Sequence, residues 1–495
     1  MVGMVRRTFI LAVVLPLLVS TAHAQVLADY EKNITEYTLA NGMHFIILED
    51  HTAPVVSFNV QVNTGSVDEK YGETGMSHLM EHLAFNGTRR IGTRNWQAES
   101  KVFAELDRVY EKMLKARKEK QGEEYLQKLQ AEFERLNGKA AEYAEPNEFG
   151  KIMDMEGSGG LNAYCSHDMT VFWVELPSNK TELWALMESD RLFNPVFRGF
   201  YEELEVVREE RRMRVENSPF GRLMEEFNNI GYSVHPYRNP VIGYPDDLEY
   251  MTRGRVAGFY RTHYVPSNIV VAIAGDIRPA ELIPLLERYF GKARAGKKAE
   301  SSIPAEPPME RTERRVTVRM DSEPIFLTGF HVPDIGHPDS PVLDVCSEIL
   351  AGGRTSRLYK RLVKEERIAL STASWCMTPK YPGMFYIWAV AASGHTNAEL
   401  ESAVMDEIEK MKKSPVTEDE IEGARARLRM GFLTGLRERR GMAEELAWYS
   451  SITGDWRNLF RYTEKLEKVT REDVTAAMNR YMRMEDRIVG TVERE

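Results

Sequence analysis

The sequence predicts an α+β protein built from two homologous domains, each an antiparallel-rich mixed sheet packed with helices. Short runs rich in β-branched residues alternate with segments of helical periodicity, so strands and helices are interspersed along the chain. A length of 495 residues is too great for one ordinary domain. The second half also repeats the order of the first, with paired strands followed by a helix that ends in Gly-rich sequence.

The elements of the first half follow from apolar periodicity and turn residues. Asn41-Gly42 tolerates the positive φ of a tight turn and is expected to join two strands as a hairpin. The last strand is nearly all apolar, which is typical of a sheet interior. Strands are expected over 34–39, 44–48, 55–62, 161–176 and 268–277, and helices over 75–85, 180–193 and 202–216.

The first 24 residues have the pattern of an export signal. Arg6 and Arg7 precede the apolar run 9–19, and Ala22-His23-Ala24 offers small residues where a signal peptidase cleaves. The run is short for a bilayer helix, and no later segment approaches that length. We therefore expect cleavage near Gln25 and an exported, periplasmic or secreted chain without a membrane anchor.

Two further segments divide the mature chain. Residues 103–143 place apolar residues at helical spacing among dense charges, which predicts a helical insertion. Its charged side is expected to be a solvated face, with contact to a partner as the alternative. Residues 292–313 combine Pro, Ser, Gly and charge without periodicity, as linkers do. The expected domains are therefore 25–291 and 314–495.

The overall charge excludes one class of partner. The formal net charge is −10, with 28% charged and 43% hydrophobic residues, as in an ordinary globular protein. No basic stripe marks a nucleic-acid footprint, so no nucleic-acid partner is expected.

The segment His78-Leu79-Met80-Glu81-His82 indicates a metal site. Two histidines four apart on a helix face the same way, so both imidazoles can reach one ion. Glu81 lies close enough on that face to take a proton from a water at the metal. The order H-x-x-E-H is the inverzincin signature. The plain alternative is a helix with two solvated or hydrogen-bonded histidines.

A third ligand is expected from the helix over 202–216. A hydrolytic zinc site takes three protein ligands and keeps one open position. Glu203 and Glu210 are seven apart and therefore share a face of this helix. One carboxylate can bind the metal while the other orients a histidine. Glutamates in so charged a run are more often only a polar face.

Several segments of the chain resemble those of one known family. Residues 72–88 (GETGMSHLMEHLAFNGT) closely resemble the zinc segment of the pitrilysin/insulinase family, most of all the branch of mitochondrial processing peptidase and its bacterial relatives. Residues 161–164 (LNAY) resemble its edge-strand motif, and residues 203–210 its second glutamate helix. Other segments match in order and extend the resemblance over nearly all of the mature chain: 235–237, 264–268, 274–276 and 349–359.

The resemblance implies a role for each site residue. It implies that one Zn²⁺ per chain is bound by His78, His82 and Glu210. Glu81 corresponds to the general base and Glu203 to the acidic partner one helical repeat before the ligand. Glu209 competes with Glu210, and the seven-residue spacing from Glu203 favours Glu210.

The resemblance also implies an activity and a shape. A zinc-dependent endopeptidase is expected, with two halves that close as a clamshell around peptides or unfolded polypeptides. Substrate would pair with the strand at Asn162, Ala163 and Tyr164 through its backbone.

Two positions depart from the family pattern. The family's second domain carries an Arg and a Tyr seven apart, whereas this chain has Lys364 and Ser371. A sister chain that supplies the Arg and Tyr would complete the site as a heterodimer. Alternatively the chain acts alone or as a homodimer. A non-catalytic subunit with a decayed site is the competing class of function.

Overall fold

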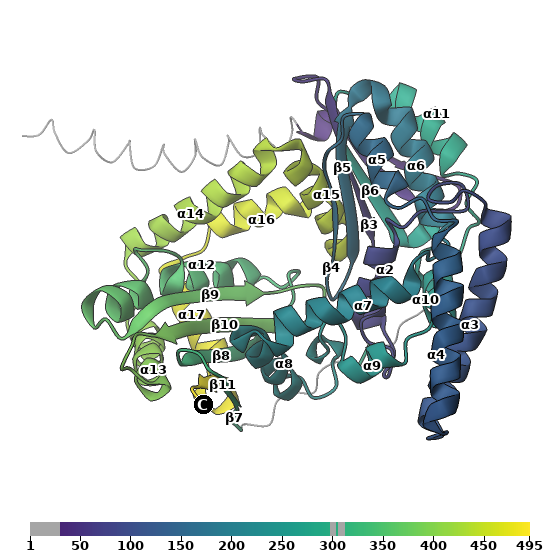
Figure 1. Ribbon diagram of the computed structural model, residues 1–495. Coiled ribbons are helices and arrows are strands. Elements are labelled where there is room, and N and C mark those ends of the chain that lie inside the picture. Colours follow the sequence, from purple (N-terminus) through teal and green to yellow (C-terminus); the bar gives the residue numbers. More distant parts are fainter. Residues whose placement is uncertain (1–29, 298–302, 305–311) are drawn as a thin grey trace, which may run out of the picture.

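The structure is a computed structural model that describes residues 30–297, 303–304 and 312–495 (Figure 1). The expected signal peptide, residues 1–24, lies outside the described residues, as do 298–302 and 305–311 of the expected linker. Among the described residues, no helix is long and apolar enough to cross a membrane.

The first sheet has six strands in the order β1-β2-β6-β3-β5-β4. Only β2 and β6 pair in parallel, and every other neighbouring pair is antiparallel. The strands are β1 (Ile34–Thr38), β2 (His44–Glu49), β3 (Val55–Val62), β4 (Gly159–Cys165), β5 (Thr170–Pro177) and β6 (Ile269–Gly275). The sequence predicts strand character over 161–176, and the structure divides this stretch into the hairpin β4–β5, because the chain turns at 166–169. All residues of β6 are buried, as its apolar sequence predicts.

The second sheet has five strands in the order β7-β11-β8-β10-β9. They are β7 (Arg314–Arg319), β8 (Ile325–Val332), β9 (Ala369–Met377), β10 (Gly383–Ala391) and β11 (Ile488–Glu493). This order repeats β2-β6-β3-β5-β4, and the parallel pair β7/β11 repeats β2/β6. Two mixed sheets of one topology are what an internal duplication would produce.

Helices pack on both sheets. The longer ones are α2 (Met76–Leu83), α3 (Trp96–Lys118), α4 (Glu123–Ala141), α5 (Glu148–Met155), α6 (Thr181–Phe193), α7 (Phe200–Arg211), α8 (Pro219–Gly231), α10 (Arg253–His263), α11 (Pro279–Tyr289), α12 (Ser340–Ala351), α13 (Asn397–Lys413), α14 (Glu418–Arg437), α15 (Arg439–Thr453), α16 (Asn458–Glu467) and α17 (Arg471–Tyr481). The chain is therefore α+β, with two mixed sheets and helices around each.

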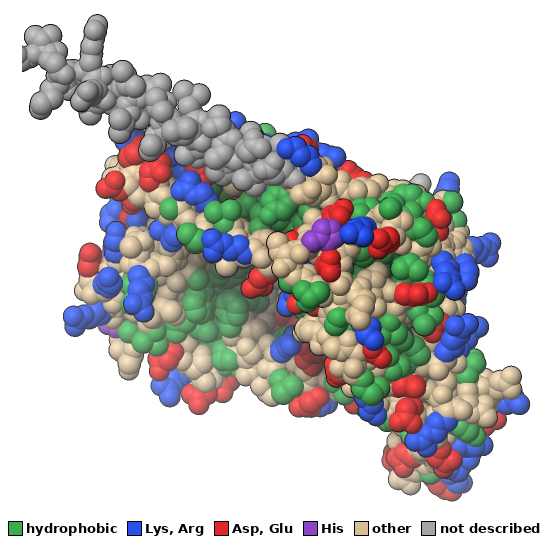
Figure 2. All heavy atoms as spheres, turned by 90° about the horizontal axis from the view of Figure 1, so that it is seen from above, with side chains coloured by type: hydrophobic (Ala, Val, Ile, Leu, Met, Phe, Trp, Pro, Cys, Tyr) green, Lys and Arg blue, Asp and Glu red, His purple; other side chains and the backbone are tan. Residues whose placement is uncertain are grey.

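One helix of each half packs on the sheet of the other half. Helix α8 of the first half packs on β7 and β11, where Leu223 and Phe227 are fully buried. Helix α15 of the second half packs on β3 and β6, where Leu446 is fully buried. Burying one such side chain contributes about 1.5–3 kcal/mol. These two helices therefore hold the halves together. Figure 2 shows a hollow in the surface with hydrophobic side chains in it.

The charged segment after α2 forms two helices, α3 and α4, joined by a short loop. The Asn95 side chain accepts a hydrogen bond from the Ala98 backbone N–H and thereby begins α3 seven residues before the expected start of the insertion. The hairpin is not solvated all round. Tyr110 and Phe133 pack against Tyr201 of α7, with ring centroids 4.5 and 5.1 Å away. The insertion therefore supports the helix that carries Glu203 and Glu210.

Candidate metal site

Helix α2 begins at a close approach between two backbones. Gly75 has φ +87°, and a Cβ on it would lie 2.7 Å from the Ile242 carbonyl oxygen. The conformation and the contact both require glycine here. The tight turn places His78 in the first turn of α2 and His82 about one turn later.

A buried carboxylate caps this helix start. Glu69 accepts backbone hydrogen bonds from Gly75 at 2.9 Å and Ser77 at 2.6 Å, which satisfies two donors of the first turn. Burial raises the pKa of Glu69 to about 8, although these two bonds oppose the rise. Glu69 is not among the residues that the sequence predicts for the site, because nothing in its spacing relates it to α2.

The two histidines and one glutamate converge. His82 Nε2 lies 3.3 Å and His78 Nε2 lies 3.6 Å from the same Glu210 carboxylate oxygen, Oε2. Two ligands at zinc distances of about 2.0–2.1 Å and a tetrahedral angle are about 3.4 Å apart. The ligand atoms of His78, His82 and Glu210 lie within 4.8 Å of one another. Among the described residues, this is the only group of three or more His, Cys, Asp or Glu side chains close enough to hold a metal ion.

The donor set suits zinc. Two imidazole nitrogens and one carboxylate oxygen form a ligand set of hydrolytic zinc sites, and three protein ligands leave one position open. Arg214 contacts the other oxygen of Glu210 at 2.8 Å. That ion pair keeps the Glu210 carboxylate turned so that Oε2 faces the histidines.

The pKa of His78 is lowered and that of His82 is raised. Burial, helped by the positive charges of His82 and Arg214, lowers the pKa of His78 to about 3, so its imidazole is neutral at neutral pH. Burial alone would lower the pKa of His82. The hydrogen bond to Glu203 and the charges of Glu81 and Glu210 outweigh it, so this pKa lies above its ordinary value. A neutral imidazole is the form that binds a metal.

Glu203 orients His82. Its Oε1 lies 2.8 Å from His82 Nδ1, and its other oxygen accepts a hydrogen bond from the Asn86 side chain at 3.3 Å. That bond directs the opposite nitrogen, Nε2, toward Glu210. The hydrogen bond from His82 is also the main reason that the pKa of Glu203 is lowered.

Glu81 lies beside the ligands. Its Oε2 is 3.9 Å from His78 Nε2. Burial raises the pKa of Glu81, opposed by the charge of His82 and reinforced by that of Glu210. A carboxyl group with a raised pKa next to an open metal position is suited to proton transfer.

Glu209 faces another way. It pairs with Arg212 at 2.6 Å, and 57% of its side chain is exposed, against 13% for Glu210. The structure therefore places Glu210, and not Glu209, with the histidines.

The strand with Asn162, Ala163 and Tyr164 is close to this group. It is β4, which among the described strands pairs with β5 alone and so forms an edge of the sheet, and it contacts α2. Figure 1 shows this edge of the first sheet facing the second half. Asn162 is exposed, and Ala163 and Tyr164 are half-buried. A pocket of about 310 Å³, whose lining includes His78, Cys165, His167 and Arg214, adjoins the metal group.

Lys364 and Ser371 belong to the second half. Lys364 is exposed near the end of a π-helical segment (Tyr359–Glu365), with its ammonium group 5.9 Å from the Tyr359 ring centroid. Ser371 lies in β9, the edge strand of the second sheet, and pairs with Val390. Neither side chain extends as far as the Arg and Tyr that the resemblance leads us to expect.

Known proteins share both sequence and fold with this chain. The model of the insulinase family (peptidase family M16) matches residues 44–105, and that of the peptidase M16 inactive domain matches residues 250–428. A zinc protease from Helicobacter pylori, PqqE, is 26% identical over 484 residues, which cover 95% of each chain.

Solved structures agree on the fold. A protease from Helicobacter pylori superposes with a TM-score of 0.77 at 23% identity, over 93% of this chain and 99% of that one. The periplasmic protease PqqL from Escherichia coli gives a TM-score of 0.68 at 16% identity, over 93% of this chain and 47% of that one.

Proposed function

The chain belongs to the M16 (insulinase) family of peptidases, and from this we propose that it is a zinc-dependent endopeptidase of peptides or unfolded polypeptides. One observation carries the proposal. His78, His82 and Glu210 converge on a common point, with the Glu81 carboxylate beside them. A decayed site would have no reason to keep this arrangement together with the Glu203 contact.

Each residue has a defined task in this proposal. His78, His82 and Glu210 would hold one zinc ion, which when bound would supply a Lewis acid for the substrate carbonyl and would lower the pKa of the attacking water. Glu81 takes the proton of that water on Oε2 and returns it to the leaving amide nitrogen. Glu203 keeps His82 in the orientation in which Nε2 faces Glu210.

Substrate binding is proposed for the free edge of β4. An extended peptide would add to this edge through backbone hydrogen bonds at Asn162, Ala163 and Tyr164. Such pairing depends on an extended backbone more than on side chains, which favours unfolded or short substrates. The contact between β4 and α2 supports the proposal, because it keeps the bound peptide near Glu81.

The wider biology is also proposed. We infer an exported, periplasmic chain from the expected signal at residues 1–24. Domains over 25–291 and 314–495 would close as a clamshell around the substrate, with the linker 292–313 between them. The matched strand orders of the two sheets support this division.

One alternative rests on the second half. Lys364 and Ser371 stand where the resemblance leads us to expect an Arg and a Tyr. A sister chain with that pair would then complete the site in a heterodimer. A homodimer or a monomer remains the simpler arrangement.

Metal analysis combined with a digest tests the proposal. Purified mature chain should hold about one zinc ion per molecule and cleave an unstructured peptide internally. A chelator should abolish cleavage, and added zinc should restore it. Cleavage that persists after complete removal of the metal would contradict the proposed function.

A further inference from the structure

The turn between β4 and β5 meets the second half of the chain at a buried carboxylate. Asp168 lies in this turn and is only 6% exposed. The Tyr237 hydroxyl donates to its carboxylate, 2.9 Å from Oδ1 and 2.8 Å from Oδ2. The backbone N–H of Lys380 donates to Oδ2 at 3.3 Å. Lys380 belongs to the turn between β9 and β10, so one hairpin turn from each half meets at Asp168.

Tyr237 completes this junction. It lies in a short 3-10 turn (Pro236–Arg238) after α8 and is 1% exposed. Its hydroxyl also accepts the backbone N–H of Tyr381 at 3.2 Å. Burial and the charge of Asp168 raise the pKa of Tyr237, so the hydroxyl keeps its proton and remains a donor. One phenol group therefore connects the β4–β5 turn of the first half to the β9–β10 turn of the second.

The turn end of β4 is its fixed end. Two backbone N–H groups of the segment 66–67 donate to the carbonyl oxygens of Ser166 and His167, at 3.2 and 2.9 Å. At the other end of β4, Gly159 and Gly160 are exposed, and the pairing with β5 is irregular there. Glycine-rich strand ends specify register weakly. The alignment of the β4 edge is therefore set mainly from its turn.

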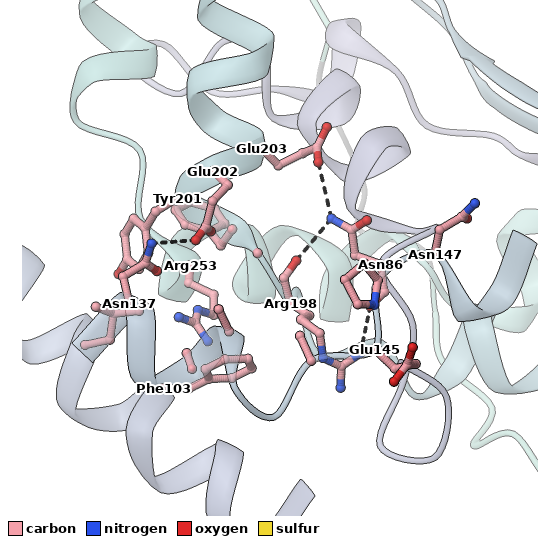
Figure 3. Close-up of a pocket in the computed structure, with 17 residues that line it drawn as sticks. Asn86, Phe103, Asn137, Glu145, Asn147, Arg198, Tyr201, Glu202, Glu203 and Arg253 are labelled. Atoms are coloured by element: carbon pink, nitrogen blue, oxygen red, sulfur yellow. Dashed lines mark hydrogen bonds between the residues drawn. The ribbon is translucent and has the colours of Figure 1, made fainter. Parts of the chain in front are cut away.

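Glu203 shows how a side chain can act on this site through another residue. It orients His82 without binding the metal, and its second oxygen accepts a hydrogen bond from Asn86. Figure 3 shows this contact in a pocket of about 300 Å³ whose lining also includes Arg253. Asp168 has the corresponding place on the substrate side, because it follows Tyr164 by four residues in the same hairpin.

We propose that Asp168 and Tyr237 are positioning residues, which form a latch that aligns the β4 edge with the second half before a peptide binds. This inference rests on the proposed function of β4 as the substrate strand. An edge that is already aligned loses less conformational entropy when an extended peptide pairs with it, so the latch strengthens peptide binding. Loss of the latch weakens binding and leaves the metal group and Glu81 intact.

Hydrogen exchange tests the latch itself and requires no catalysis. Tyr237→Phe removes one hydroxyl and keeps the ring, so the Tyr381 N–H loses its acceptor and the turn 166–169 loses its tie. Mass spectrometry should show exchange up to about tenfold faster in both turns, the effect of one lost hydrogen bond. Tyr260→Phe is the matched control, because its hydroxyl donates to the Leu192 carbonyl within the first half. Unchanged exchange in both turns of the Tyr237 variant would overturn the latch.

Kinetics test the effect on substrate. The zinc-loaded Tyr237→Phe chain should show a KM for an unstructured peptide at least about tenfold higher, with kcat within about twofold, because only binding is weakened. Its zinc content and circular dichroism should equal those of the wild type, which separates positioning from damage to the fold. Tyr260→Phe should keep normal kinetics. A fall in kcat at unchanged KM would overturn the positioning role.

A double-variant cycle tests whether the two residues act as one unit. Asp168→Ala removes the carboxylate and should raise KM as Tyr237→Phe does, and the double variant should be no worse than the poorer single variant. Fully additive effects would overturn the pair. Absence of cleavage by the wild-type chain would overturn the proposed function and, with it, the role in substrate binding. The exchange rates would still show whether the latch joins the two turns, so the two failures are distinguishable.

Discussion

His82 Nδ1 lies 2.8 Å from Glu203 Oε1, and this contact joins the helix of the H-x-x-E-H segment to the helix of the third ligand. The other nitrogen of the same ring, Nε2, lies 3.3 Å from Glu210. Glu203 and Glu210 are seven residues apart on α7, so one face of this helix contacts both ring nitrogens of His82. The geometry of the metal group therefore depends on a residue that does not itself bind the metal.

Removal of the Glu203 charge should weaken zinc binding without abolishing it. Glu203→Gln loses the acceptor that orients His82, and such changes cost about 10- to 100-fold in metal affinity. Competition with a chromophoric chelator measures the effect. Glu205→Gln, on the exposed side of the same helix, is the control and should keep normal affinity. Equal affinities of both variants would show that His82 is held by other contacts.

Replacement of Glu81 should separate metal binding from turnover. Glu81→Gln leaves His78, His82 and Glu210 in place, so the zinc content should stay normal. Peptide hydrolysis should fall by about 10²–10⁴-fold, the contribution of a general acid–base group. Zinc analysis and a fluorogenic peptide assay on one preparation measure both quantities. Near-normal hydrolysis would rule out Glu81 as the base.

Glu210 and Glu209 provide a matched pair of variants. Glu210→Gln should lose zinc, because it removes the charged oxygen nearest both histidines. Glu209→Gln should retain zinc, because Glu209 is exposed and paired with Arg212. Metal analysis after dialysis distinguishes them. Loss of zinc from the Glu209 variant alone would place the third ligand one residue earlier.

The two histidines should titrate differently in the metal-free chain. The pKa of His82 is raised, so its imidazole should take up a proton above pH 6.5, whereas His78, with a pKa of about 3, should stay neutral at pH 5. Protons compete with zinc at His82, so zinc affinity should fall as the pH drops through that raised pKa. Glu203→Gln removes a cause of the rise and should move this loss to lower pH. Nuclear magnetic resonance of the imidazoles measures both titrations. Protonation of His78 before His82 would contradict this order.

The isolated chain should cleave unstructured peptides without a sister chain. The zinc group and Glu81 are contained in one chain, and Lys364 still offers a positive charge in the second half. Loss of one hydrogen-bond donor to the oxyanion of the tetrahedral intermediate lowers the rate by about 10²–10³-fold. If the Arg and Tyr donors are missing from this chain, the double variant Lys364→Arg, Ser371→Tyr should therefore cleave faster. The assay compares both proteins, each loaded with zinc. Cleavage that depends on an added sister chain would favour the divided site.

Much of the metal site could be predicted from the sequence, because its spacings are those of single helices. Residues four or seven apart share a helix face whatever packs around them, so His78 and His82, like Glu203 and Glu210, could be paired in advance. The turn within 161–176 could not be placed, because both arms of the β4–β5 hairpin have strand character. The role of Glu69 could not be predicted in the same way. It lies outside α2, and only the tertiary structure brings its carboxylate to the start of that helix.

The sequence by itself determined the α+β class, the H-x-x-E-H helix and the second glutamate helix, since each depends on local periodicity. Only the tertiary structure decided how these parts meet. It packed α8 and α15 each on the sheet of the other half. It also packed the insertion against α7 and placed Arg253 in the same pocket lining as Glu203. The physical reason is that such contacts join residues far apart in the chain. Their free energy comes from burial and charge pairing that appear only once both partners are in place.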